Sequence, residues 1–405
     1  MFGKNKALWG NAPFKPAYDA VIVGGGVHGL ATAYYLARDY GMKNIAVVEK
    51  RHVGFGGTGR NTAIISSNQR TGENLLLHDE GLKLWPKLSE ELDFNLMFHK
   101  CGILDLAHSE DALANMRLKV ASAKFMGIES EIRDAKGCGE LVSALDISDR
   151  PRYPIMGGMY HPPGGTVSHD AVAWGLARGA AKLGVHIHQG TQVSGIGIEK
   201  GRVVSVETDK GTIHTPTVLN AAGAYSPLIS DMAGIRLPVE VLSVQAMVTQ
   251  PIRPMLRHIV SSDEYRCYAN QTLKGEIAMG ADMGALPNHT KQTTAHYIRY
   301  QAEAITELLP CLRGVKFMRA WAGLADMTWD MAPITDGNDH VEGYYMDCGW
   351  GSFGFKSGVV AGKYMAEFMA LKIYPRILRP FTLRRFENYC LSGEAGKPVY
   401  YGPWN

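Results

Sequence analysis

Residues 18–60 read YDAVIVGGGVHGLATAYYLARDYGMKNIAVVEKRHVGFGGTGR, and the order of patterns in this stretch decides the fold. A short apolar run leads into a glycine turn, which is followed by a helical pattern and by a second apolar run that ends at Glu49. In the turn, Gly24 permits the tight bend, Gly26 lets the backbone approach a phosphate, and Gly29 lets the helix pack closely on the sheet. The N-terminus of that helix favours an anion. The stretch therefore predicts a dinucleotide-binding unit.

Glu49 gives this prediction more weight than a glycine triplet alone would carry. It lies 20 residues after Gly29, where a carboxylate can bond ribose hydroxyls. An acid at this position argues against a ligand with a 2′-phosphate. It does not separate NAD from FAD, so both remain open at this point.

The composition is that of a globular protein. Of the 405 residues, 46% are hydrophobic and 20% are charged, which suits a large core in about two domains. The formal net charge of +3 gives no reason to expect nucleic acid or a membrane surface as a partner. No apolar run reaches the length of a membrane span, and no secretory signal precedes residue 18. The six scattered cysteines lack a C-x-x-C pair, so we expect reduced thiols in a cytoplasmic protein.

Alternating strand and helix patterns predict an α/β fold, in which a doubly wound sheet is interrupted by a second domain. We expect the nucleotide-binding domain to be discontinuous, over residues 18–75, 155–240 and 331–395. An inserted α+β domain with a mixed or antiparallel sheet should then comprise residues 76–154 and 241–330. Residues 1–17 are expected to form an N-terminal arm and residues 396–405 a C-terminal tail.

Two glycine-rich segments outside the opening unit also suit a cofactor. Residues 54–67 (GFGGTGRNTAIISS) predict a loop that runs under the nucleotide toward its reactive end, with Arg60 and Asn61 as its side chains of clear polar reach. Residues 348–370 predict a turn that enters an amphipathic helix. The amides at such a helix start carry partial positive charge, which suits a ring that becomes anionic on reduction.

Two further positions stand out on chemical grounds. The apolar run 217–222 ends in Ala222-Gly223, which suits close approach of the backbone to a cofactor. His169 stands at the start of a helix predicted within residues 164–183, and a capping or surface role is the default interpretation of a lone histidine there. Neither H-E-x-x-H nor G-x-S-x-G is present, so no metal site or serine nucleophile is predicted.

Taken together, five motifs resemble the D-amino-acid-oxidase-like flavoproteins, and among them most the beta subunits of heterotetrameric sarcosine oxidases. The motifs are VIVGGGVHGLATAYYLA with Glu49, GGTGRN, GGTVSHDAVAWG, AWAG and GWGSFGFKSG. The resemblance extends over essentially the whole chain. It implies an FAD-binding, Rossmann-like sheet domain and a substrate domain over the flavin.

The resemblance also implies an activity. The N-methyl (secondary) amine of a small amino acid such as sarcosine would be oxidised, with a hydride passing to N5 of FAD and electrons passing on to an FMN. Glycine and a one-carbon unit would be released. The FMN would be linked covalently to His169 at an interface with a large alpha-like subunit, and small subunits would complete a heterotetramer.

The same resemblance assigns site residues. Lys356 and Arg60 are expected to be catalytic. The residues expected to hold cofactor are Gly24, Gly26, Gly29, Glu49, Lys50, Gly57, Thr58, Gly59, Arg60, Asn61, His169 (covalent FMN), Val193, Ala222, Gly223, Arg319, Trp321, Gly349, Gly351, Gly354, Phe355 and Lys356.

Two departures from the family pattern matter. The segment RAWAGLADM lacks the cysteine that holds FAD in monomeric sarcosine oxidases, so FAD should be noncovalent. Ser66 follows Ile64-Ile65, where beta subunits usually have an arginine, and Arg70 is a candidate to replace it. If that arginine binds the substrate carboxylate, sarcosine is not the only candidate substrate.

Three alternatives therefore stay open. The first is a beta-like subunit of a dehydrogenase for another secondary amino acid, for example N-methylglutamate. The second is a flavin-holding assembly subunit with little turnover. The third is an NAD-dependent dehydrogenase, which the C-terminal GWGSFGFK argues against because an NAD fold needs no distant loop beneath a tricyclic ring.

Overall fold

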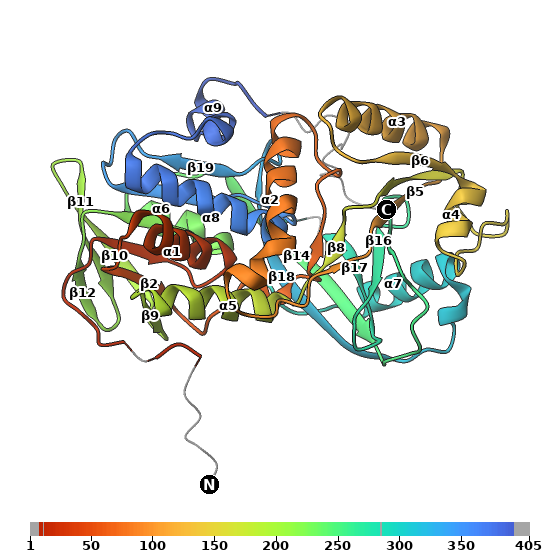
Figure 1. Ribbon diagram of the computed structural model, residues 1–405, viewed down its shortest axis with the longest axis horizontal. Coiled ribbons are helices and arrows are strands. Elements are labelled where there is room, and N and C mark those ends of the chain that lie inside the picture. Colours follow the sequence, from red (N-terminus) through yellow and green to blue (C-terminus); the bar gives the residue numbers. More distant parts are fainter. Residues whose placement is uncertain (1–7, 11, 284–285, 393–405) are drawn as a thin grey trace, which may run out of the picture.

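The fold is built on two large sheets that meet at a central cavity. The computed structural model describes residues 8–10, 12–283 and 286–392, so the predicted C-terminal tail lies outside the described residues. Figure 1 shows the first sheet with helices α1, α5 and α8 on the left and the second sheet with α3, α4 and α7 on the right. Within the described ranges, none of the helices combines the length and apolar character that a bilayer crossing requires.

The first sheet has six strands in the order β19-β20-β13-β1-β2-β9, and all neighbours are parallel except β19 and β20. The bounds are β1 (Ala20–Val23), β2 (Ile45–Glu49), β9 (His186–Gln189), β13 (Val218–Asn220), β19 (Ile334–Gly337) and β20 (Tyr344–Cys348). Every residue of β1 is buried, as the AVIV run predicts for a central parallel strand. The predicted doubly wound sheet is therefore confirmed.

Helices cover one face of this sheet and strands cover the other. The helices are α1 (Val27–Tyr40), α2 (Gly72–Glu91), α5 (His169–Lys182) and α8 (Gly354–Leu371). They share one core, which contains Leu30, Trp85, Leu176 and Val359. The opposite face packs on α6 (Ser226–Met232) and on an antiparallel meander of β10 (Val193–Glu199), β11 (Arg202–Thr208) and β12 (Gly211–His214).

Helix ends follow local signals in the sequence. Gly41 ends α1 in the left-handed conformation (φ 69°), and its N–H donates to Leu36 O. Ser168 caps α5, because its side chain accepts a hydrogen bond from Ala171 N. Pro86 lies inside α2, which nevertheless continues to Glu91 because it packs against α8.

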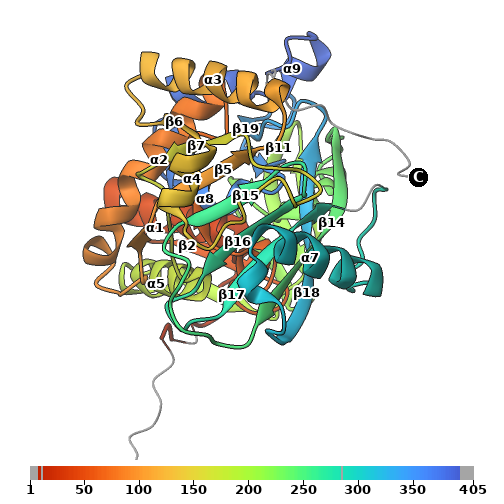
Figure 2. The ribbon, with the colours of Figure 1, turned by 90° about the vertical axis from the view of Figure 1, so that its right-hand side faces the viewer.

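The second sheet has eight strands in the order β18-β14-β17-β16-β15-β5-β7-β6, antiparallel except for β15 and β5. The bounds are β5 (Ile103–Ala107), β6 (Glu131–Asp134), β7 (Gly157–His161), β14 (Val239–Thr249), β15 (Ile259–Ser262), β16 (Cys267–Gln271), β17 (Ile277–Met283) and β18 (Phe317–Thr328). Figure 2 shows α7 in front of strands of this sheet, and its Ala304, Ile305 and Leu308 pack in a separate core with them.

Shorter elements complete the chain. The remaining helices are α3 (Glu110–Phe125), α4 (Ala135–Leu141), α7 (Ala295–Leu308) and α9 (Arg384–Glu387). The 3-10 turns are η1 (Gly57–Arg60), η2 (Gly223–Tyr225), η3 (Pro310–Leu312) and η4 (Arg376–Phe381). A small sheet joins β3 (Ile64–Ile65), β8 (Gly165–Thr166) and β4 (His99–Lys100).

The predicted division into domains stays a prediction, but two elements lie across its boundaries. Helix α2 packs in the core of α1 and α8, although residues 76–154 are assigned to the inserted domain from sequence. Strand β7 pairs with β5 and β6 in the eight-stranded sheet, although residues 155–240 are assigned to the nucleotide-binding domain. Amphipathic patterns specify that an element has a buried face, and they do not specify which core receives it.

Candidate functional site

A cavity of about 550 Å³ lies between the carboxyl edge of the six-stranded sheet and a face of the eight-stranded sheet. Val23, Glu49 and Asp347 line it from the ends of β1, β2 and β20. Ser261 and Tyr268 line it from β15 and β16. This is the position at which open parallel sheets bind ligands, because strand order reverses between adjacent strands and leaves a crevice.

The glycine turn after β1 is too tight for side chains. A Cβ on Gly24 (φ 119°) would lie 2.4 Å from Ala221 O, and one on Gly29 would lie 2.2 Å from Gly24 O. Gly24 and Gly26 line the cavity, whereas Gly29 packs α1 onto the sheet. The turn therefore presents bare backbone and the start of α1 to the cavity, which is the arrangement that binds a pyrophosphate.

Glu49 supports the turn and faces the cavity. Its Oε2 accepts a hydrogen bond from Gly25 N at 2.9 Å, and its Oε1 accepts one from Arg51 N at 2.8 Å. Each carboxylate oxygen retains a further acceptor site. The geometry is thus compatible with the predicted bonds from ribose hydroxyls.

Two lysines and a tyrosine form a cluster beside Glu49. Lys50 Nζ lies 3.0 Å from the centroid of the Tyr225 ring, and Lys291 Nζ donates to Tyr225 Oη at 3.1 Å. Although burial alone would raise the pKa of Tyr225, the hydrogen bond from Lys291 and the charge of Lys50 lower it. Sequence reasoning missed Tyr225 and Lys291. The signal that could have identified Tyr225 is its position two residues after the predicted Ala222-Gly223 segment.

The turn η1 contributes to the lining of the main cavity and of a second one. Arg60 lines both, and its guanidinium lies 4.7 Å from the centroid of the Phe55 ring. Trp321 holds the turn by donating from Nε1 to Arg60 O at 2.7 Å. The second cavity, of about 500 Å³, is lined by Arg60, Lys291, Gln292, Thr293, Arg319, Ala320, Trp321 and Ala322. Arg319 and Trp321 thus belong to this second cavity.

Lys356 is the buried cation of the main cavity. It lies in the first turn of α8 with 8% of its surface exposed. Its Nζ donates to Ser66 Oγ at 2.9 Å and to Gln69 Oε1 at 3.1 Å. Gln69 lines the cavity and donates from Nε2 to Asp105 Oδ1 at 3.1 Å. Gln69 was not predicted, because nothing local in NQRTG marks it; folding brings it to α8.

Two histidines near Lys356 carry no charge at neutral pH. Burial, together with the charges of Arg70 and Lys356, holds the pKa of His78 well below its usual range. Burial lowers the pKa of His161 to about 4. Arg70 is itself buried, with its guanidinium 3.7 Å from the Phe353 ring centroid, and it does not line the cavity. Lys356 is therefore the cation that the described structure presents at this wall.

The turn between β20 and α8 closes the cavity from the other side. Gly349 and Gly351 adopt left-handed conformations (φ 72° and 61°), and Gly349 N donates to Asp326 Oδ2 at 2.7 Å. Burial raises the pKa of Asp326 to about 6. Gly351, Gly354 and Phe355 line the cavity, whereas Gly349 does not. Gly349 has a local reason for being glycine, since a Cβ there would lie 2.6 Å from Thr328 Cγ2.

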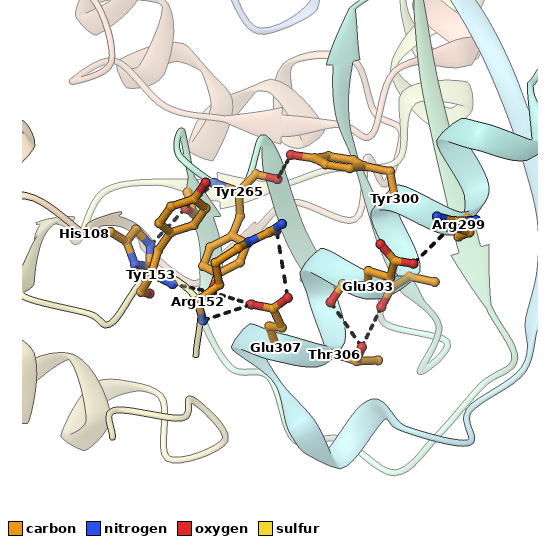
Figure 3. Close-up of polar contacts among 11 residues, drawn as sticks. His108, Arg152, Tyr153, Tyr265, Arg299, Tyr300, Glu303, Thr306 and Glu307 are labelled. Carbon is orange, nitrogen blue, oxygen red and sulfur yellow. Dashed lines mark hydrogen bonds and ion pairs between the residues drawn. The ribbon is translucent and has the colours of Figure 1, made fainter. Parts of the chain in front are cut away.

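The turn from β15 to β16 is held firmly against the cavity. Figure 3 shows the network around Tyr265, which lies in this turn. Tyr300 Oη donates to Tyr265 O at 3.1 Å, and Tyr265 Oη donates to Glu307 Oε2 at 2.8 Å. Tyr153 N donates to Tyr265 Oη at 3.0 Å. These bonds fix the wall that carries Tyr268, whose Oη accepts a hydrogen bond from Thr62 Oγ1 at 2.9 Å.

His169 lies outside the main cavity. It is the first residue of α5, with 30% of its side chain exposed, and its Nδ1 lies 3.0 Å from Asp170 Oδ1. The start of α5 packs against η1, where a Cβ on Gly59 would lie 3.8 Å from Asp170 Oδ1. The histidine is therefore partly exposed, at a helix start that packs beside the η1 turn.

The cavity brings together most of the predicted residues. Those that line it are Gly24, Gly26, Glu49, Lys50, Gly57, Thr58, Arg60, Asn61, Val193, Ala222, Gly223, Gly351, Gly354, Phe355 and Lys356. Those that do not are Gly29, Gly59, His169, Arg319, Trp321 and Gly349. The part of the chain that the structure describes contains no group of three or more His, Cys, Asp or Glu residues able to hold a metal ion.

Comparison with known proteins agrees with this geometry. The family model for FAD dependent oxidoreductases (DAO) matches residues 19–368. Sarcosine oxidase subunit beta from Rhodobacter capsulatus is 37% identical over 379 residues, which cover 94% of this chain and 91% of the relative. The subunit of the same name from an Arthrobacter species is 38% identical over 389 residues, which cover 96% of each chain. The resemblance stated from the sequence motifs is confirmed.

A solved structure shows the same architecture. L-proline dehydrogenase from P. horikoshii superposes with a TM-score of 0.87 and 27% sequence identity, over 93% of this chain and 99% of that one. The predicted fold class is confirmed.

Proposed function

Because the chain belongs to the FAD dependent oxidoreductase family, together with sarcosine oxidase beta subunits, we propose that it oxidises the secondary amine of a small N-methyl amino acid such as sarcosine. The observation that carries the proposal is the single cavity that joins the bare glycine turn after β1 to the buried cation Lys356. A dinucleotide held at one end of this cavity would place its reactive end beside Lys356.

The residues present fit FAD. Gly24 and Gly26 leave backbone and no side chain where the pyrophosphate would lie, and Glu49 offers acceptors for ribose. No cysteine occurs in the β18 segment RAWAGLADM, which supports noncovalent binding. When bound, FAD would supply the acceptor for the hydride that leaves the carbon next to the amine nitrogen, and FMN would be the next electron acceptor.

The protein's own groups orient the amine and keep water out. Lys356 Nζ, fixed by Ser66 and Gln69, supplies a positive charge that would hold the substrate carboxylate. Tyr268 and the face of the eight-stranded sheet close the opposite wall. Fixed groups of this kind lower the barrier because the substrate is already oriented when the hydride leaves. Glycine and a one-carbon unit are the products expected from sarcosine.

We further propose that FMN is linked to His169 and lies against the second cavity. The exposed imidazole at the start of α5 is accessible to a partner subunit. Arg60, Lys291 and Arg319 at the second cavity would balance a phosphate. A large alpha-like subunit would cover this side, with small subunits completing the assembly.

Ser66 is the reason to consider a second substrate. Its hydroxyl stands where an arginine is usual in the family, and it bonds Lys356 instead of contributing a charge of its own. An N-methyl or secondary amino acid other than sarcosine, for example N-methylglutamate, is therefore the alternative substrate, and a flavin-holding role with little turnover is the alternative to catalysis.

Anaerobic reduction of the flavin tests the proposal. The purified complex would be mixed with sarcosine, N-methylglutamate, L-proline or glycine, and the loss of the 450 nm absorbance followed by stopped flow. We expect rapid bleaching by an N-methyl amino acid and little by glycine, which lacks the methyl group. A yellow protein that no secondary amine bleaches would support the flavin-holding role instead.

Lys356→Met tests the role of the cation. We expect the apparent dissociation constant of the amino acid, obtained from the concentration dependence of flavin reduction, to rise by roughly 10- to 100-fold. A rise of this size is typical for the loss of a charge-assisted hydrogen bond. Lys372→Met is the matched control, because Lys372 ends α8 and donates to Tyr345 Oη away from the cavity. Equal behaviour of the two variants in flavin reduction would contradict the assignment.

His169→Ala tests the covalent FMN. Acid precipitation of the wild-type complex should leave fluorescent flavin in the protein pellet and release FAD into the supernatant. The variant should lose pellet flavin and keep extractable FAD, while His52→Ala should resemble the wild type. A colourless wild-type pellet from a complex that contains FMN would exclude the linkage and leave amine oxidation untouched.

A further inference from the structure

His28 lies within the glycine turn motif GGGVHG and has two partners from the other end of the chain. Its Nδ1 lies 3.1 and 3.0 Å from the two carboxylate oxygens of Asp347. Its Nε2 lies 3.0 Å from Gly354 O. Asp347 is at the end of β20 and Gly354 begins α8. The imidazole therefore spans the gap between the start of α1 and the start of α8, and it lines the main cavity with both partners.

The partners of His28 specify its protonation. A carboxylate and a carbonyl only accept hydrogen bonds, so both ring nitrogens satisfy them when both carry hydrogen. Trp350 contacts both members of the pair. Its Nε1 donates to Asp347 Oδ1 at 2.6 Å, and its ring centroid lies 4.9 Å from that of His28. Both contacts are hydrogen bonds when the ring is an imidazolium, which would then be paired with the buried carboxylate of Asp347.

Glycines make room for this contact. A Cβ on Gly354 would lie 2.7 Å from Trp350 Cβ and 3.3 Å from His28 Nε2. A Cβ on Gly358, one turn later, would lie 2.5 Å from Val27 Cγ1. The starts of α1 and α8 are consequently in direct contact, with the His28 ring between them. Because the contact is close-packed, a displacement of one turn would require a displacement of the other.

The surroundings of His28 favour the charged form. Burial lowers the pKa of His28, but the charge and hydrogen bond of Asp347, the charge of Asp326 and the Gly354 carbonyl together raise it above its ordinary value. The titratable groups around the pair are Asp347 and Cys348 on β20, Asp326 on β18, His78 on α2 and Lys356 on α8. Of these, His78 is neutral, since burial and the cations Arg70 and Lys356 hold its pKa well below the usual range.

We propose that His28 is a positioning residue for FAD: as an imidazolium bound to Asp347 and Gly354, it locks the turn that faces the pyrophosphate to the turn that carries Lys356. The inference rests on the membership of the chain in the FAD dependent oxidoreductases and not on the identity of the amine. Residues at both ends of the cavity then move as one unit, so the affinity for FAD depends on the charge of His28.

The sign of the pH dependence follows from the raised pKa. The lock is fully present at pH values below the ordinary pKa of histidine and is lost as pH rises through the higher pKa of His28 in the folded protein. Asp326, with a pKa of about 6, titrates below that range. Deprotonation of His28 leaves one of its two acceptors without a donor, which weakens the contact between the turns.

The test measures the FAD dissociation constant of the full chain by fluorescence from pH 6 to 10. At pH 6.5, His28→Gln should bind FAD about tenfold more weakly than the wild type, as expected for the loss of a charge-assisted hydrogen bond. The ratio of the two constants should fall toward one at high pH, and titrations of FAD itself cancel in this ratio. His188→Gln is the matched control, because His188 is a buried histidine bonded to Tyr18 outside the cavity.

Asp347→Asn separates positioning from a merely structural role. The amide keeps an acceptor for Trp350 but removes the charge, so the pH at which FAD affinity weakens should move to a lower value than in the wild type. Asp326→Asn should remove a transition near pH 6 and, because the charge of Asp326 also raises the pKa of His28, lower the His28 midpoint by less than Asp347→Asn does. A wild-type/His28→Gln ratio that is constant with pH, or an unchanged midpoint in Asp347→Asn, would overturn the proposal. If His28→Gln does not fold, the difference between the wild type and Asp347→Asn in the pH midpoint of FAD affinity still tests the proposal.

Discussion

At the scale of single residues, the site depends on buried charges that have specific partners. Lys356 Nζ donates to the oxygens of Ser66 and Gln69, which hold the ammonium group at the wall of the cavity. Asp326 is also buried, but its carboxylate accepts a backbone N–H from Gly349. A buried carboxyl group with a raised pKa opposes folding when it is ionised. Ionisation of Asp326 should therefore lower the free energy of unfolding.

Asp326 should make the protein less stable as pH rises. Its pKa of about 6 in the folded protein exceeds the unfolded value of 3.8, so its contribution is complete below about pH 4 and is lost by about pH 6. Asp326→Asn keeps an acceptor for Gly349 N. We expect the variant to be more stable than the wild type by about 1–3 kcal/mol at pH 7.5 and by little at pH 4.

Urea unfolding of the FAD-free chain at several pH values checks this expectation. The exposed Asp231→Asn should show no such pH-dependent difference. An Asp326→Asn variant that is less stable than the wild type at pH 7.5 would mean that the ionised carboxylate contributes more through its hydrogen bond than it loses by burial.

At the scale of elements, the contact between α1 and α8 positions the cavity. Gly358 and Gly362 face α1 one turn apart, and a Cβ on Gly362 would lie 2.5 Å from Ala31 Cβ and 2.7 Å from Thr32 N. Because these glycines have no Cβ, the two helices can approach until their backbones nearly touch. The starts of both helices then point at the same cavity, which explains why residues so distant in sequence share it.

Gly362→Ala should therefore separate these helices. Alanine would favour the helix by roughly 0.5–1 kcal/mol through its propensity. Overpacking against backbone atoms, which cannot move aside as a side chain can, typically costs about 1–3 kcal/mol. We expect net destabilisation in urea unfolding and weaker FAD binding, with Lys363→Ala on the adjacent position as control. A stabilised variant would show that the helices can move apart without loss.

At the scale of the whole molecule, FAD would join the two large sheets. Residues that line the cavity extend from Val23 to Lys356 and come from both the six-stranded and the eight-stranded sheet. A ligand that contacts only the folded state stabilises it by mass action. Because the lining residues come from both sheets, a ligand that contacts only one sheet should stabilise less than one that contacts both.

Thermal unfolding of the FAD-free chain with added ligands checks this. At 100 times its dissociation constant, FAD should add about 2.7 kcal/mol to the free energy of unfolding. AMP and FMN, each at the same concentration as FAD, should raise the melting temperature less. If AMP raised it as much as FAD, the flavin end of the cofactor would lie outside the cavity.

Much of the fold could be predicted because its signals are local. The AVIV strand, the glycine turn, α1 and the acid at Glu49 follow one another within a short stretch, and steric limits at each glycine permit few other conformations. The strand β18 was harder to recognise: FMRAWAGLADMT contains three alanines and a glycine, and pairing along β14 makes it a strand. Helix α4 and strands β6 and β15 are short and carry no clear periodicity, so they were also missed.

By itself, the sequence determined a dinucleotide-binding unit, the helices with strong caps and periodicity, and a set of residue types suited to a flavin. Only the tertiary structure decided that Lys356 meets Ser66 and Gln69, and that His28 lies between Asp347 and Gly354. The physical reason is the range of the forces involved. Turns and helix caps depend on neighbours a few residues away, whereas these contacts join positions about 300 residues apart and form only when whole helices and sheets pack.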